Sequence, residues 1–320
     1  MRIPLLSSCA ESCYDSQWAG LLHARSPLPE PKGGGGGHGG SRGSSKSSKG
    51  SSTKSTPAVG SRGATVPISG TTFGSGKTTS TAYGSGGVKV TTIPQDQPFA
   101  GRTYGGATRG EIYGTSVYGS GYPGVFGSGV AGGNFPYIYP PVVWVDYGYG
   151  PPYLYSAHEY GEPRNTNRTG GPEMQAAFSS PSSNSTFHII ADNSTIVSLI
   201  GSIRANCSGK FSDNSSSASP APYGSSATSD PRPEGAIQYY RASSVVLTLD
   251  GYNNTVALSS DPNANTKAVP LPPNVDLQLL GCLNSTIGEA VPLINSALGL
   301  SSPGMATTVG LMLVFLWHLV

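Results

Sequence analysis

The chain has 320 residues, of which 45 are glycine and 27 are proline, whereas only 11% carry a charged side chain. This composition is too poor in apolar side chains for one large core over the whole length. The formal net charge of +2 hides an asymmetry, because residues 31–95 contain eight basic and no acidic residues, whereas residues 167–295 contain six basic and nine acidic ones. The two halves therefore differ in charge and composition, which excludes a single uniform domain.

Residues 1–30 form an uncertain N-terminal segment. Their apolar stretch near the start has only four residues, from Ile3 to Leu6, and is broken by Pro4. It is shorter than the apolar core of a secretory signal peptide, so residues 1–30 stay an uncertain segment and are not evidence against export.

Residues 31–160 are of low complexity and predict a disordered arm rich in glycine, serine and tyrosine. A loose aromatic-Gly-Ser-Gly repeat begins at Phe73, Tyr83, Tyr118 and Phe126. Aromatic rings spaced along a chain that does not pack them suit weak multivalent contacts, and a passive spacer is the alternative. Near the end of the arm, the stretch from Pro140 to Asp146 predicts an extended clasp onto the next domain, because its prolines argue against a central strand.

Residues 165–295 predict a small α+β domain. Thr186–Ile190 has the composition of a strand, and Asp192 then offers a capping oxygen to a helix. The apolar face of that helix consists of Ile196, Ile200, Ile203 and Cys207.

The rest of the domain follows the same kind of signals. A Ser/Pro-rich loop is expected over 212–233, a short helix over Pro233–Tyr240, and a strand over Val245–Leu249 that ends at a turn. A last helix is expected after Asn274, with Leu280, Leu283 and Ile287 on its apolar face. Short apolar runs are ambiguous, so a two-layer all-β fold remains the alternative.

Two cysteines, Cys207 and Cys282, lie in this domain and predict one structural disulfide if the protein is exported. Two free buried thiols are the alternative. A bond between residues 75 positions apart would stabilise the domain by roughly 4 to 5 kcal/mol in the loop-entropy model.

Asn-x-Ser/Thr sequons support export, because they cluster in the foldable region. They stand at Asn167, Asn184, Asn193, Asn206, Asn214, Asn253 and Asn284, with none before Asn167. This distribution predicts a glycosylated extracellular domain.

The C-terminal residues have the order of a GPI-anchor signal. Asn295 is followed by the small residues Ser296 and Ala297, then by an uncharged spacer and the apolar tail Val309–Val320. These twelve residues would span about 18 Å as a helix, short of the roughly 30 Å hydrocarbon core. We therefore expect lipid attachment at Asn295, a propeptide over 296–320, and location at the outer face of the plasma membrane or in the cell wall. A tail-anchored protein is the alternative.

No catalytic or cofactor-binding pattern stands out. The histidines have no zinc-site spacing, and the remaining candidates for enzyme chemistry are His188, Asp192 and Asp250. We expect no enzyme activity, no cofactor, no metal and no nucleic-acid partner; wall polysaccharide is a possible counterpart of the basic arm.

Several stretches resemble a group of uncharacterised secreted or GPI-anchored, Gly/Tyr-rich surface proteins of basidiomycete fungi. These are Gln97–Arg102 to Tyr118–Gly124, Gly161–Pro172, Ala191–Thr195, Gln238–Ser244, Leu249–Asn254 and Cys282–Leu293. The resemblance implies a fungal surface protein and no particular activity.

Together these patterns predict a GPI-anchored cell-surface glycoprotein with a structural or adhesive role. An extracellular glycan- or peptide-binding module is the main alternative, which an exposed aromatic cleft would favour, and a secreted enzyme is the third.

Overall fold

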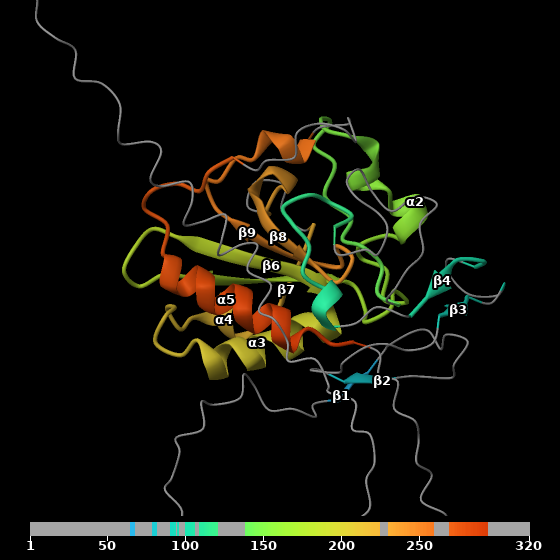
Figure 1. Ribbon diagram of the computed structural model, residues 1–320, viewed down its shortest axis with the longest axis horizontal. Coiled ribbons are helices and arrows are strands. Elements are labelled where there is room, and N and C mark those ends of the chain that lie inside the picture. Colours follow the sequence, from blue (N-terminus) through green and yellow to red (C-terminus); the bar gives the residue numbers. More distant parts are fainter. Residues whose placement is uncertain are drawn as a thin grey trace, which may run out of the picture.

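The computed structural model describes residues 65–67, 79–81, 90–93, 95, 100–105, 109–120, 138–224, 230–258 and 269–293. In this part of the chain a five-stranded sheet packs against two longer helices, α3 (Asn193–Asn206) and α5 (Leu277–Ala290). Figure 1 shows the two helices side by side against the sheet. The predicted segments 1–30 and 296–320, and Asn295, lie outside the described residues.

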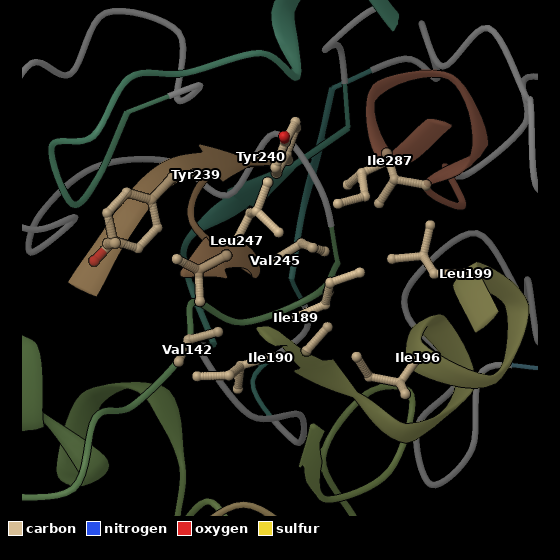
Figure 2. Packing of buried hydrophobic residues seen from close by; sticks show 14 of the residues in the cluster. Val142, Ile189, Ile190, Ile196, Leu199, Tyr239, Tyr240, Val245, Leu247 and Ile287 are labelled. Carbon is tan, nitrogen blue, oxygen red and sulfur yellow. The ribbon is translucent and has the colours of Figure 1, made fainter. Parts of the chain in front are cut away.

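The sheet has the strand order β7-β5-β6-β9-β8, with antiparallel pairing throughout. Its strands are β5 (Glu173–Ser179), β6 (Thr186–Asp192), β7 (Ala221–Pro222), β8 (Ala236–Tyr240) and β9 (Val245–Leu249). Alternation along the central β6 sends Ile189 and Ile190 to opposite faces. Figure 2 shows Ile190 beside Val142, in a segment that covers the face of the sheet opposite to the helices.

Shorter elements surround this sheet. They are the strand pairs β1 (Thr65–Pro67) with β2 (Thr79–Thr81) and β3 (Thr91–Thr92) with β4 (Thr103–Tyr104), the 3-10 turns η1 (Arg109–Glu111), η2 (Pro152–Tyr155), η3 (Pro233–Gly235) and η4 (Thr255–Leu258), and the short helices α2 (Ala157–Tyr160) and α4 (Ser215–Ala218). The described part is thus richer in strands than the sequence predicts, while α3 and α5 leave the all-β alternative without support.

Both long helices begin at an aspartate cap. The Asp192 carboxylate accepts from the backbone N–H of Thr195 at the start of α3, as the sequence predicts. At the start of α5, which follows Asn274 as the sequence predicts, the Asp276 carboxylate accepts from the N–H groups of Gln278 and Leu279. The predicted apolar faces of both helices are buried against the sheet.

The prediction of a helix over Pro233–Tyr240 is wrong. Only a single 3-10 turn forms at η3, and the chain then runs directly into β8. All five residues of β8 are buried, and the strand pairs with β9 across a tight hairpin. Ile237 and the two tyrosines that follow Gln238 have strand propensity, and burial on both faces selects the strand.

Residues 138–160, here called the clasp, cover the second face of the sheet. Val142 N–H donates to the Ser243 carbonyl at 2.9 Å, and the Val142 carbonyl accepts from the Tyr118 hydroxyl at 2.7 Å. The clasp contains no β-strand, and the stretch around Pro140 lies outside helices and strands, as the sequence predicts. Its buried side chains include Ile138, Tyr139, Val142, Val143, Trp144, Leu154 and Tyr160.

The predicted disordered arm over 31–160 is therefore wrong for 109–120 and 138–160, which belong to the packed body. Short strands also occur at β1 to β4, where no secondary structure was expected. The reason is that these glycine- and proline-rich segments still supply large apolar side chains, among them Ile112, Tyr118 and Trp144, each buried. The domain thus begins well before residue 165. Within the arm, only the residues that the ranges at the start of this subsection omit lie outside the described part.

A buried arginine, Arg241, joins the helices to the hairpin. Its guanidinium donates to Asp192 Oδ2 at 2.8 Å, to Thr195 Oγ1 at 3.0 Å and to the Pro292 carbonyl at 2.9 Å. Its Nε donates to Ser244 Oγ at 2.7 Å, and the Tyr139 ring lies 3.5 Å from the guanidinium carbon. The Arg241 guanidinium is fully buried, and its hydrogen bonds and the ion pair with Asp192 compensate for its lost hydration.

Removing this cation should weaken the whole body. We expect Arg241→Met to lower the free energy of unfolding by about 3 to 5 kcal/mol, because the Asp192 charge then stays buried without its partner. The matched control is Arg204→Met, which removes the exposed ion pair with Asp213 and should have little effect. Urea unfolding at pH 7 measures both, and equal losses in the two variants would contradict the role given to Arg241.

A second buried ion pair fixes the clasp. Arg168 Nη2 donates to Glu173 Oε1 at 2.7 Å, and the same oxygen accepts from Val143 N–H at 2.8 Å. Burial raises the pKa of Glu173 to about 7, although Arg168 and the Val143 N–H both oppose the shift. The folded protein thus binds this proton more tightly than the unfolded chain does.

This shift predicts a pH dependence of stability. The contribution of Glu173 is complete below pH 4.5 and is lost as the pH rises through about 7, amounting to about 3 kcal/mol at most. We expect the free energy of unfolding to fall over that window in the native sequence and to lose this decline in Glu173→Gln. Urea titrations between pH 4 and 8 test it; a native stability that rises with pH over the same range would show that the ion pair with Arg168 dominates instead.

Candidate functional site

The sequons separate into exposed and enclosed asparagines. Asn167, Asn184, Asn214 and Asn253 are exposed on the described body. Asn193, the first residue of α3, is half-buried. Asn206 is also half-buried, with its Nδ2 enclosed by protein, and Asn284 on α5 accepts a hydrogen bond from the Tyr240 hydroxyl at 2.6 Å. Asn167, Asn184, Asn214 and Asn253 are thus the exposed sequon asparagines of the described body, although the Asn214 side-chain oxygen also accepts from Ser217 N–H at the start of α4.

The disulfide predicted from the sequence is confirmed. It joins Cys207, the residue that caps the C-terminus of α3, to Cys282 within α5, with 5.9 Å between the two Cα atoms. The bond therefore ties together the two helices that cover one face of the sheet. It closes a loop across 75 residues, which includes β8, β9 and the hairpin between them.

The three residues considered for enzyme chemistry fall into two separate places. His188 Nε2 and Asp250 Oδ1 lie 3.1 Å apart at one end of the sheet, and Asp250 is largely exposed. Asp192 instead serves as the α3 cap and the partner of Arg241, so its oxygens are committed to structure. The described residues hold no cluster of three or more side chains suited to a metal ion.

A polar depression of about 400 Å³ lies next to Asp250. It opens at the end of the β8–β9 hairpin that is remote from the turn, between η3 and the residues that follow β9. Its lining consists of Asp230, Pro231, Arg232, Glu234, Gly235, Thr248, Leu249, Asp250, Gly251 and Tyr252. Three carboxylates and one guanidinium thus share a small space.

Tyrosines of the clasp stand at the side of this depression. Tyr149 donates its hydroxyl to Glu234 Oε1 at 2.9 Å and accepts from Arg232 at 3.3 Å. The Arg232 guanidinium carbon lies 4.6 Å from the centre of the Tyr147 ring, which is stacked with Tyr149 at a centroid distance of 6.2 Å. Partial burial, and then the hydrogen bond to Glu234, raise the pKa of the Tyr149 phenol, so this donor stays protonated at neutral pH.

Sequence reasoning missed this site except for Asp250. Its walls come from residues near 232 and 250, and the tyrosines near 147 reach its side because the clasp docks on the hairpin. The one available signal is the run of tyrosines that follows Asp146, directly after the stretch predicted to form the clasp.

Comparisons with protein-family models, curated proteins and solved structures found no match to this chain. Within the described residues, no helix combines the length and the apolar composition needed to cross a membrane.

The exposure of the asparagines predicts which sequons carry glycans. We expect Asn167, Asn184, Asn214 and Asn253 to be modified, and Asn206 to be unmodified because its amide nitrogen is enclosed in the folded body. Glycopeptide mass spectrometry of the protein secreted by a eukaryotic host measures each site. Asn184→Gln should remove one glycan, whereas Asn206→Gln should leave the glycan mass unchanged; a glycan found on Asn206 would contradict the prediction.

Proposed function

We propose that this chain is a cell-surface glycoprotein held at the outer face of the plasma membrane by a GPI anchor, with a structural or adhesive role. The observation that carries the proposal is the disulfide between α3 and α5. Structural disulfides persist in oxidising compartments, so this bond supports export. The four exposed sequons on the same body support it further.

The position at which the packed body ends supports an anchor close to it. The Pro292 carbonyl accepts from Arg241, and Leu293 is fully buried. The proposed attachment residue, Asn295, stands only two positions further along the chain. An anchor there would hold the body close to the lipid headgroups, with no long linker between the disulfide-bonded domain and the membrane.

The proposed role is one of display rather than catalysis. A rigid body with several exposed glycan sites and a basic segment over 31–95 suits contact with acidic or phosphorylated wall polysaccharide. The surface proteins of basidiomycete fungi that the sequence resembles fit the same proposal.

The anchor is tested at its tail. Leu313→Asp with Phe315→Asp should abolish release of the protein from cells by phosphatidylinositol-specific phospholipase C, because each charge opposes membrane insertion by about 3 kcal/mol. The apolar pair Leu313→Ile and Phe315→Leu is the control and should be released normally. Asn295→Trp should block cleavage of the signal and leave the tail attached.

Mass spectrometry of the mature protein decides between the two outcomes. A C-terminal peptide that ends at Asn295 and carries an ethanolamine-linked glycan supports the anchor. A mature protein that still contains Trp317 keeps its apolar tail, and the GPI proposal is then wrong.

A further inference from the structure

The depression beside Glu234 has the size of a ligand site. Its volume of about 400 Å³ falls within the range of roughly 300 to 1,000 Å³ that small-molecule pockets occupy. The two walls come from η3 and from the end of β9, which are joined by the β8–β9 pairing. A depression of this size suits a small molecule or one to two residues of a polymer, rather than the flat surface of a partner protein.

The charges of the lining favour a cation. Three carboxylates, those of Asp230, Glu234 and Asp250, face one guanidinium, that of Arg232. The Arg232 side chain is held over the Tyr147 ring and against the Tyr149 hydroxyl, at the side of the depression. Asp230 and Asp250 have protein partners of their own, Gln175 at 2.6 Å and His188 at 3.1 Å. The lining thus keeps an excess of negative charge.

Two polar atoms of the lining residues have no hydrogen-bond partner within the described part of the chain. One is Glu234 Oε2, whose sister oxygen accepts from Tyr149. The other is Thr248 Oγ1, on a residue that is only 1% exposed. Buried polar atoms in folded proteins are normally paired, because an unpaired one loses its hydration without replacement. Glu234 and Thr248 both line the depression, and their two unpaired atoms are covered by protein. A ligand with several donors would satisfy both atoms after a small movement of these side chains.

The tyrosine side of the depression suits a ring-shaped ligand. Tyr147 and Tyr149 are stacked, with 27° between their ring planes, and Tyr149 is 36% exposed. Such rings offer a flat apolar surface beside fixed hydroxyl donors. The Glu234 carboxylate lies next to this surface, where it accepts from Tyr149. An apolar ring face beside a carboxylate suits a sugar ring, which has apolar faces and hydroxyl edges.

From these observations we infer that the depression binds a saccharide bearing free amino groups, with its ammonium on Glu234 and Asp250, its hydroxyls toward Thr248 and its ring against the tyrosines. Charge-assisted hydrogen bonds to the ammonium would supply the selectivity over uncharged sugars. This inference goes beyond the proposed surface role and does not require the anchor, so either one can fail alone.

The test uses the full-length protein in detergent and a glucosamine tetramer with all amines free. Isothermal titration at low salt should show saturable binding, weakened by added salt because the attraction is between charges. The fully N-acetylated tetramer, which has the same rings without the charge, should bind about tenfold more weakly. Glu234→Gln and Thr248→Val should each reduce affinity for the free-amine tetramer, the former by about tenfold.

Glu289→Gln is the matched control, because Glu289 is a partly exposed carboxylate on α5, outside the lining. It should leave the affinity unchanged, and thermal melting should show that all three variants fold. Equal affinity for the acetylated tetramer overturns the selection of amines. Tighter binding of tetralysine than of the glucosamine tetramer would assign the site to basic peptides and overturn the saccharide. Binding that survives Glu234→Gln and Thr248→Val together overturns the location.

Discussion

The fold depends on the placement of one buried guanidinium. Arg241 connects four distant segments: the cap of α3 through Asp192, the C-terminal stretch through Pro292, the clasp through Tyr139 and its own hairpin through Ser244. Removing a charge from water costs several kcal/mol, so the guanidinium stays buried only when its hydrogen-bond partners are fixed around it. The segments that carry these partners must therefore fold together. This explains why segments on either side of the hairpin form one body instead of separate units.

The hairpin turn beside this cation has an unusual backbone. Arg241, Ala242 and Ser243 have φ angles of 48°, 53° and 60°, a left-handed conformation that side chains other than glycine disfavour. Tertiary contacts hold the turn: Arg241 N–H donates to the Ile112 carbonyl, the Ser243 carbonyl accepts from Val142, and Ser243 Oγ accepts from Gly119 N–H. The segments once expected to be a disordered arm are therefore the partners that make the turn possible.

The sequence predicts those elements whose signals are local. The Asp192 cap and the apolar repeat after it indicate α3, and the prolines near 140 indicate an extended clasp. The signal fails at Pro233–Tyr240, where Pro233 and Glu234 resemble a helix start but the Arg-Ala-Ser-Ser turn that makes β8 a hairpin strand contains no glycine. The depression was equally hidden, because residues near 147, 232 and 250 meet only through β8–β9 pairing and clasp docking.

The two ends of the β8–β9 hairpin have different roles: the turn is held by structural contacts, and the opposite end lines the depression. At the turn, the strands are fixed by Arg241 and by the clasp; at the opposite end, the same strands lead into the lining residues Gly235, Thr248 and Leu249. Five-residue strands buried along their whole length transmit that order with little freedom to shift register. The carboxylates beside the depression are thus held in place before any ligand arrives, so binding there would lose less conformational entropy than binding on a free loop.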